Sequence, residues 1–175
     1  FSSLSGRVVL ITGGSGSIGS TLASAFLQQG CSVVTVDLME SPAFGDVGGH
    51  HTHLVVDLAN LAAVADLPSR VLDAYGRLDI VVCAAAFVGT SATKGWTVPF
   101  EEQDESMWGH VLGVNLTANF ALIKAAFEPL AANGVGSVIL VSSIYALVAP
   151  RPSLYEGLPI DNPAGYAVSK AGVTQ

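Results

Sequence analysis

The chain has 175 residues, of which 50% are hydrophobic and 12% are charged, and its formal net charge is −7. This composition suits one folded domain with a buried parallel sheet and excludes a disordered chain. The seven basic residues are scattered singly, no apolar run is long enough to span a bilayer and no signal peptide is recognisable, so we expect a cytoplasmic protein without nucleic-acid or membrane partners.

Short apolar runs alternate with helix-like segments along the whole chain. The predicted strands cover residues 6–11, 31–37, 53–56, 78–83 and 137–141. The predicted helices cover residues 18–29, 59–75, 100–112, 115–130 and 166–175, and a break near Pro68 stays open. This alternation predicts a three-layer, doubly wound α/β fold around a parallel sheet, in a single domain.

A glycine-rich turn follows the first predicted strand and precedes the first predicted helix. From Thr12 onward it runs Thr-Gly-Gly-Ser-Gly-Ser-Ile-Gly. Glycines allow a tight turn and close backbone approach, and the N-terminus of the next helix offers free N–H groups to a pyrophosphate. A flexible turn without a ligand is the alternative, because a glycine motif alone is weak evidence.

Asp37 ends the second predicted strand, about 20 residues past the glycines. A carboxylate at this position can accept hydrogen bonds from the adenosine ribose hydroxyls, and it would repel a 2′-phosphate. The sequence therefore favours NAD over NADP, with a solvated aspartate at the strand end as the alternative. Ala84 and Ala85 follow the fourth predicted strand, where small side chains let the backbone pass close to a ligand.

The histidines and cysteines do not indicate a metal site. His50 and His51 lie in a glycine-rich loop, with His53 just beyond it, and no acidic or cysteine ligand has matching spacing. We interpret the segment as an exposed polar turn before the strand that begins at His53. Cys31 and Cys83 are expected at opposite ends of different strands. No disulfide is therefore expected, in keeping with a reducing cytoplasm.

Tyr166 and Lys170 are four residues apart in a predicted helix, so both side chains lie on one face. A nearby ammonium favours the phenolate form of a tyrosine, which can then exchange a proton with a substrate hydroxyl or carbonyl. Ser143, at the end of the fifth predicted strand, could hydrogen-bond the same oxygen. Ligands of open α/β sheets bind at that edge, so these residues, the glycine turn and Asp37 are predicted to share one crevice. A solvated helix face would explain a lone Tyr–Lys pair, but not the whole set.

The predicted helix 115–130 is apolar on two sides. Phe120 and Phe127 belong to one side, whereas Leu122 and Ala126 belong to the other. A helix with two apolar sides is usually covered on both. We therefore expect the sheet on one side and a second subunit on the other, in a homodimer or homotetramer.

Together these motifs resemble the short-chain dehydrogenase/reductase family over essentially the whole chain. The family's Thr-Gly-x-x-x-Gly-x-Gly turn is approximated by residues 12–19. Its catalytic residues match Asn115, Ser143, Tyr166 and Lys170. The resemblance implies that Asn115 holds a water linking Lys170 to solvent, and that Lys170 also binds the nicotinamide ribose. The implied cofactor-binding residues are Gly13, Ser15, Gly16, Ser17, Ile18, Gly19, Asp37, Leu38, Asp57, Leu58, Ala84, Ala85, Tyr166 and Lys170.

Three departures separate the chain from the shorter family members. Ser17 replaces their middle glycine, and residues 83–86 read Cys-Ala-Ala-Ala in place of Asn-Asn-Ala-Gly. Segment 146–165 is longer than usual and holds four prolines. These features resemble enzymes that act on nucleotide sugars, so a sugar or sugar derivative is the expected substrate.

The resemblance implies an NAD-dependent oxidoreductase that transfers hydride between nicotinamide and a secondary alcohol or carbonyl. The alternatives are a nucleotide-sugar epimerase or dehydratase that retains its NAD, and a non-catalytic dinucleotide-binding protein. The family fold continues after Lys170 with the rest of that helix, a sixth strand, a substrate lid and a seventh strand. We therefore expect the sequence, which stops at Gln175, to be truncated shortly after the catalytic helix begins.

Overall fold

The computed structural model describes residues 4–41, 43–44, 48–132, 134–158 and 160–175. The chain divides into two compact units, and each is built from two stretches of sequence. Unit 1 comprises Phe1–Ala85 and Ala118–Val141, and unit 2 comprises Ala86–Thr117 and Ser142–Gln175.

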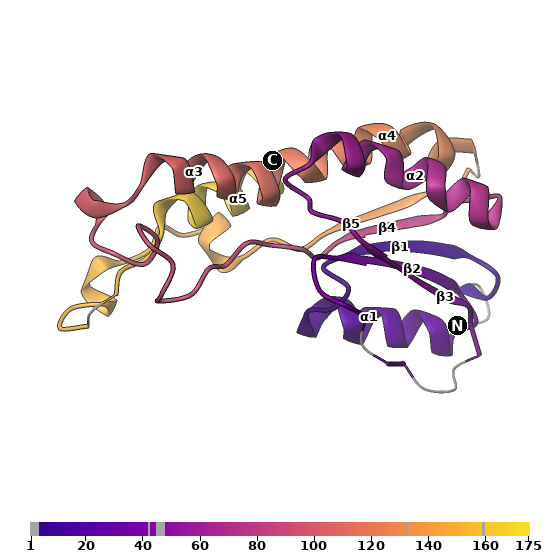
Figure 1. Ribbon diagram of the computed structural model, residues 1–175, viewed down its shortest axis with the longest axis horizontal. Helices are drawn as coiled ribbons and strands as arrows, with labels where there is room; N and C mark the ends of the chain where they lie inside the picture. The colour runs from indigo at the N-terminus through magenta and orange to yellow at the C-terminus, as the bar shows by residue number, and fades with distance from the viewer. Residues whose placement is uncertain (1–3, 42, 45–47, 133, 159) are drawn as a thin grey trace. The chain divides into compact units, whose positions relative to one another are not determined.

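A parallel sheet of five strands forms the centre of unit 1 (Figure 1). Its strand order is β3-β2-β1-β4-β5. The strands are β1 (Val8–Thr12), β2 (Ser32–Asp37), β3 (His51–Val55), β4 (Ile80–Cys83) and β5 (Ser137–Leu140). Every residue of β1 and β4 is buried, as expected for central strands that are covered on both faces.

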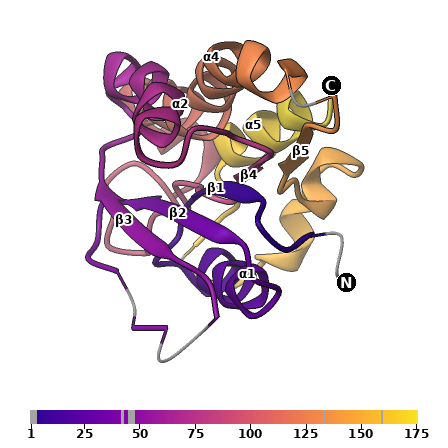
Figure 2. The same ribbon diagram turned by 90° about the vertical axis from the view of Figure 1, so that its right-hand side faces the viewer.

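Helices cover both faces of this sheet. Helix α1 (Ser17–Gln28) lies on one face, and α2 (Leu61–Tyr75) and α4 (Ala118–Ala132) lie on the other (Figure 2). Residues of α1 such as Ala23 and Leu27 pack with strand residues in a fully buried cluster. The three-layer, doubly wound parallel sheet predicted from the sequence is confirmed.

The order in which the strands are added to the sheet reverses next to β1. The chain runs outward from β1 to β2 and β3, and then returns to β4 on the opposite side of β1. In open α/β sheets, ligands bind outside the carboxyl ends of the strands at such a switch point. The turns that follow β1 and β4 lie there together, because a Cβ atom on Gly13 would lie 2.6 Å from the backbone nitrogen of Ala85.

Unit 2 consists of short helices packed around α5 (Ala164–Thr174). Helix α3 (Glu105–Leu112) continues into a π-helical turn, Gly113–Thr117, and both contact α5. The unit also has 3₁₀ turns at Phe100–Glu102, Ile144–Ala146 and Pro152–Leu154. A Cβ atom on Gly172 would lie 2.8 Å from Leu116 Cδ2, so glycine allows α5 to approach the π turn closely.

The structure differs from the prediction at one of the three histidines, His51, which was expected in the loop, whereas His53 was expected at the start of the strand. His51 and His53 lie within β3, which begins two residues earlier than predicted, and only His50 is exposed. The reason is pairing with β2, since Val33 is in register with His51 and Thr35 with His53. Hydrogen bonding to a neighbouring strand outweighs the low β-propensity of the segment.

Two predicted helices start differently in the structure, and the break near Pro68 that the sequence left open does not occur. Helix α2 continues through Pro68, whose side chain is buried with the core face of the helix. The predicted helix 100–112 is interrupted, because Asp104 caps α3 and accepts a hydrogen bond from the Ser106 N–H at 2.7 Å. The predicted helix 115–130 begins with the π turn and becomes α-helical at Ala118.

One helical stretch, Glu105–Ala132, is long and apolar enough to cross a membrane by length and composition alone. Core helices of soluble proteins pass the same test, so this is weak evidence. Its α4 part packs against α2 and buries Leu122 and Ala126. Cys31 and Cys83 are both free and buried.

Candidate active site

The glycine turn in unit 1 packs so closely that several of its positions have no space for a side chain. Gly13 has a φ of +72°, and its N–H donates to the Val36 carbonyl at 2.8 Å. A Cβ atom on Gly19 would collide with the Gly13 carbonyl, so neither glycine can carry a side chain without movement. Gly16 is the N-cap of α1 and makes no side-chain cap. The exposed N-terminus of α1 therefore presents backbone to an approaching anion, as a pyrophosphate site requires.

Asp37 is held against this turn. Its Oδ2 accepts a hydrogen bond from the Ser15 N–H at 3.0 Å, and its Oδ1 accepts one from the Met39 N–H at 3.2 Å. The side chain is half-buried, and the next residues, Leu38 and Met39, are 63% and 68% exposed. A fixed carboxylate beside open apolar surface suits a ribose with its base alongside.

The other cofactor-binding residues predicted in unit 1 differ in their surroundings. Ala84 and Ala85 follow β4, and the Ala85 N–H donates to Thr12 Oγ1 at 3.4 Å. Asp57 is exposed and accepts a hydrogen bond from the Ala59 N–H at 2.8 Å. Leu58 is only 7% exposed, so its side chain belongs to the core rather than to a ligand surface. The unit therefore offers backbone N–H groups at the turn and a carboxylate at Asp37, the types of group that a dinucleotide site uses.

In unit 2, α5 carries Tyr166 and Lys170 on one face, as predicted. Lys170 Nζ lies 5.9 Å from the centre of the Tyr166 ring. Lys170 is buried, and this burial lowers the pKa of its ammonium. Tyr166 is half-buried and remains accessible to a substrate. The ammonium can therefore stabilise negative charge on the phenol oxygen when a proton is transferred.

Asn115 lies in the π turn and is completely buried. Its Nδ2 donates hydrogen bonds to the Phe87 carbonyl at 3.1 Å and to Ser169 Oγ at 3.2 Å. Ser169 Oγ in turn donates to the Tyr166 carbonyl at 2.8 Å. Asn115 is thus joined through Ser169 to the backbone of the residue that carries the phenol. A π turn is often found at a functional site.

Ser143 lies three residues beyond the end of β5 and caps the 3₁₀ turn Ile144–Ala146, which contacts α5. Its Oγ accepts a hydrogen bond from the Tyr145 N–H at 3.3 Å. The hydroxyl hydrogen stays available to donate to a substrate oxygen. Unit 2 therefore contains all four predicted catalytic residues, and unit 1 contains the predicted nucleotide-binding residues other than Tyr166 and Lys170.

Two side chains that anchor α5 were missed from the sequence. Gln103 Oε1 accepts a hydrogen bond from the Ala164 N–H at 3.0 Å, at the start of the helix. Ser142 Oγ donates to the Lys170 carbonyl at 3.0 Å. Gln103 is 61 residues from its partner, and no local pattern announces this contact. Ser142 directly precedes the predicted Ser143, and this adjacency could have indicated that Ser142 lies near the site.

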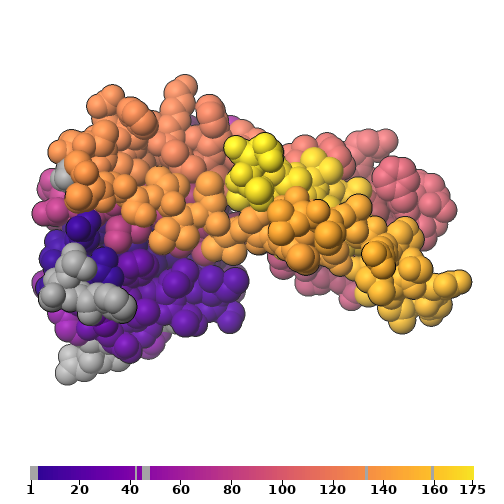
Figure 3. All heavy atoms as spheres, turned by 180° about the vertical axis from the view of Figure 1, so that it is seen from behind, coloured from indigo at the N-terminus to yellow at the C-terminus, as the bar shows by residue number. Residues whose placement is uncertain are grey.

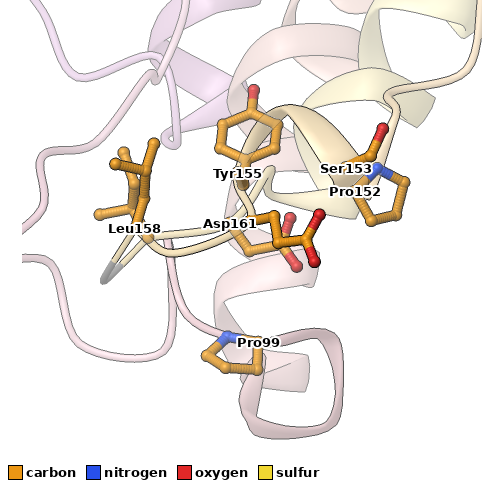
Figure 4. A pocket seen from close by; sticks show the side chains of 8 residues that line it. Pro99, Pro152, Ser153, Tyr155, Leu158 and Asp161 are labelled. Carbon is orange, nitrogen blue, oxygen red and sulfur yellow. The ribbon is translucent and has the colours of Figure 1, made fainter.

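Segment 152–161 of unit 2 borders a cavity of about 500 Å³ (Figure 4). Its lining includes Tyr155, Glu156 and Asp161, with Pro99 on another loop. The Tyr155 hydroxyl is 3.1 Å from that of Tyr145, two residues beyond Ser143. Pro159, one of the prolines noted in the sequence, lies outside the described residues. Among the residues that are described, no three His, Cys, Asp or Glu side chains are grouped to hold a metal ion.

Comparison with known proteins agrees with these features. The family profile described as short chain dehydrogenase matches residues 7–175. The chain is 31% identical over 176 residues to the 2,5-dichloro-2,5-cyclohexadiene-1,4-diol dehydrogenase LinX of Sphingobium indicum, covering 97% of this chain and 64% of that protein. It is 30% identical to the D-threitol dehydrogenase of Mycolicibacterium smegmatis, covering 97% of this chain and 61% of that protein.

A similar solved structure is a short chain dehydrogenase from Leptospira borgpetersenii with bound NAD⁺. Its TM-score is 0.79 at 25% identity, and the match covers 95% of this chain and 61% of that one. The chain thus spans about three-fifths of the length of the relatives that it matches.

Proposed function

Because the chain belongs to the short-chain dehydrogenase family, we propose that the protein is an NAD-dependent oxidoreductase acting on a secondary alcohol or the corresponding carbonyl. The observation that carries the proposal is the pairing of Tyr166 with the buried Lys170 on α5. A helix face that only supported the fold would not need an ammonium buried beside a phenol, because burying a charge is costly. Proton transfer at a substrate oxygen uses this pair directly.

NAD, when bound, supplies a hydride acceptor, and NADH supplies the donor. In alcohol oxidation Tyr166 Oη removes the hydroxyl proton while Lys170 stabilises the phenolate; in carbonyl reduction the phenol returns that proton. Ser143 Oγ donates a hydrogen bond to the same substrate oxygen in both directions. The glycine turn, the N-terminus of α1 and Asp37 would hold the dinucleotide, with the Asp37 carboxylate as the acceptor for ribose hydroxyls.

The first test is a titration of the full-length protein with NADH and NADPH, followed by the fluorescence of Trp96 and Trp108. We expect NADH to bind at least about tenfold more tightly, because the Asp37 carboxylate repels a 2′-phosphate. The variant Asp37→Ala should weaken NADH binding and reduce the ratio of NADH affinity to NADPH affinity. Equal or tighter binding of NADPH would contradict the choice of NAD. No binding of either would contradict an open cofactor site and would favour an epimerase or dehydratase with tightly retained NAD.

For the substrate, we propose a small polyol or sugar derivative. The carboxylates of Glu156 and Asp161 at the cavity in unit 2 can accept hydrogen bonds from several hydroxyl groups. The similarity to a D-threitol dehydrogenase points in the same direction. A panel of polyols and apolar cyclic alcohols, assayed by NADH formation, tests this choice. Glu156→Gln should raise the KM for polyols, and a preference for apolar alcohols would contradict the proposal.

The proposed homodimer or homotetramer rests on the outer side of α4. Phe120 and Phe127 are 68% and 63% exposed there, and with Ile123 they border a shallow recess. In Figure 3 the orange atoms of α4 and β5 lie at the molecular surface. Exposed aromatic patches commonly mark an interface. Sedimentation of the full-length protein should show an oligomer that Phe127→Glu dissociates, and a wild-type monomer would contradict it. A cytoplasmic location is part of the same proposal, in keeping with the free cysteines.

A further inference from the structure

A hydrogen-bonded group of three side chains lies between β2 and β3, next to the glycine turn. Thr35 Oγ1 is 2.8 Å from His51 Nε2 and 2.8 Å from His53 Nδ1. His53 Nε2 is 2.9 Å from the Met39 carbonyl oxygen. Val33, which is in register with His51, packs in the buried cluster with α1. Side chains two residues apart on a strand share a face, so the group lies on the α1 side of the sheet.

The chemistry of these partners determines where the protons are. A carbonyl oxygen only accepts, so the hydrogen bond to Met39 requires a proton on His53 Nε2. In a neutral ring Nδ1 is then bare and accepts the hydroxyl proton of Thr35. The Thr35 oxygen is left to accept from His51 Nε2–H. Burial, followed by the proximity of His53, lowers the pKa of His51, which keeps that ring neutral near pH 7. With both rings neutral, the hydrogen bonds run in one direction, from His51 through Thr35 and His53 to Met39.

This series of hydrogen bonds ends at Met39, two residues after Asp37. Met39 N–H donates to Asp37 Oδ1, and the Met39 carbonyl accepts from His53 and from Ser15 Oγ at 3.3 Å. Ser15 Oγ also donates to the Glu40 carbonyl at 2.9 Å. Without these bonds residues 38–40 would be an exposed loop, since all three side chains face solvent. The side chains of His53 and Ser15 tie the loop down from two directions.

Thr35 lies directly beneath the phosphate-binding turn. A Cβ atom on Gly14 would lie 2.8 Å from Thr35 Cγ2, so the methyl group packs against the turn while the hydroxyl serves the histidines. Thr35 is fully buried and cannot move aside. Through Thr35, the two histidines are therefore packed against the glycine turn that is proposed to bind the cofactor.

We propose that His53 is a positioning residue for the cofactor: by donating to the Met39 carbonyl it holds residues 37–39 in place and raises the affinity for the adenosine half of NAD. The inference rests on the proposed function, in which Asp37 binds the ribose. Neither histidine touches the cofactor in this role, and neither takes part in proton transfer to the substrate.

Two near-isosteric substitutions separate the two hydrogen bonds of His53. In His53→Gln the side-chain amide nitrogen can take the place of Nε2 and keep the bond to Met39. In His53→Asn the shorter amide can keep the bond to Thr35 but cannot reach Met39. We expect His53→Asn to weaken NADH binding about three- to tenfold, and His53→Gln to stay within about twofold of wild type. With the full-length protein, kcat should be unchanged in both variants, because α5 is not involved.

The exposed His50 provides the control. Its side chain makes no hydrogen bond to the described residues, so His50→Asn should bind NADH as wild type does. Melting temperatures of all variants are measured alongside, because a merely structural effect would lower stability in His53→Asn without changing NADH affinity. Such a result, or equal weakening by His53→Asn and His53→Gln, would overturn the proposal.

A spectroscopic measurement does not depend on how the variants fold. Long-range ¹H–¹⁵N spectra of the wild-type protein should show His53 protonated on Nε2 and bare on Nδ1. The opposite tautomer would rule out donation to Met39. The variant Asp37→Ala separates a failure of the proposed function from a failure of the role given to His53. If Asp37→Ala binds NADH as tightly as wild type, the proposed ribose contact is wrong, and the role of His53 is wrong with it. If it weakens binding while His53→Asn does not, only the role of His53 is wrong.

Discussion

Asn115 and Phe87 hold each other by two hydrogen bonds. The Phe87 N–H donates to Asn115 Oδ1 at 2.6 Å, and Asn115 Nδ2 donates to the Phe87 carbonyl at 3.1 Å. The same amide reaches Ser169 on α5. One buried side chain therefore joins the segment after β4, the π turn and the helix that carries Tyr166. The water-holding role that the family resemblance implies for Asn115 stays a prediction.

Replacing Asn115 by aspartate should be strongly destabilising. The isosteric change turns the Nδ2 donor into an acceptor that faces the Phe87 carbonyl, and it introduces a buried carboxyl. We expect a loss of about 2–4 kcal/mol in the free energy of unfolding, measured by urea denaturation. The control is Asn60→Asp, because Asn60 Oδ1 accepts from the Ala63 N–H as the N-cap of α2 and aspartate caps equally well. Equal effects at both sites would contradict the role given to the amide.

Tyr166→Phe should abolish most turnover and leave NADH binding nearly intact. Removing the phenol oxygen removes the proton-transfer group, which typically contributes about 10²–10⁴ in rate. Initial rates and a fluorescence titration measure the two effects in the full-length protein. Tyr75→Phe is the matched control, since the Tyr75 hydroxyl lies 2.7 Å from Thr52 Oγ1 in unit 1 and plays no part in the proposed chemistry. Normal turnover by Tyr166→Phe would refute the proposed mechanism.

Gly13→Ala should damage both stability and cofactor binding. Gly13 has a φ of +72°, and an added Cβ atom would lie 2.6 Å from the Ala85 nitrogen. Gly76 has the same φ but nothing within 4 Å of an added Cβ atom. We therefore expect Gly76→Ala to cost only the backbone strain, about 1 kcal/mol, with normal NADH affinity. Gly13→Ala should cost more in thermal unfolding and weaken NADH binding; matching results from the two variants would show that the contact with Ala85 is unimportant.

Because of Asp79, the free energy of unfolding should decrease as the pH becomes acidic. Burial opposes ionisation of Asp79, but hydrogen bonds from Arg77 and the Val8 N–H, with the charges of Arg77 and Arg7, outweigh it and lower the pKa of the carboxyl. Arg77 Nη2 lies 2.7 Å from Asp79 Oδ1. Since the unfolded chain binds the proton more tightly, the stabilisation is complete above the unfolded pKa of about 4. It is lost as the pH falls through the lower, folded value.

Denaturation at pH 7 and at pH 3 checks this expectation. Asp79→Asn should lower the free energy of unfolding by about 2–4 kcal/mol at pH 7 and by less at pH 3, because the wild-type advantage is then fading. Asp73→Asn, on the exposed side of α2, should change neither value appreciably. A deficit in Asp79→Asn that is the same at both pH values would contradict the assignment.

Local patterns were sufficient for much of the fold and for most of the candidate site. The apolar runs predicted all five strands within a few residues. In β1, β2 and β4 the reason is burial on both faces, which leaves a continuous apolar signature. The glycine turn, Asp37 at the end of β2 and the four-residue spacing of Tyr166 and Lys170 are likewise short-range features. Each depends on backbone geometry within one or two elements, which the order of the residues already specifies.

Contacts between distant residues were decided only by the tertiary structure. Pairing with β2 extended the third strand back to His51, although the sequence before His53 is typical of a loop. Gln103 caps α5 from 61 residues away, and Leu58 is buried beside residues proposed to bind the cofactor. In each case a hydrogen bond or an apolar contact forms with a partner that no local pattern identifies. The sequence by itself determined the alternation of strands and helices and the chemical groups of the site; folding determined which of those groups are fixed, which are buried and which remain open to a ligand.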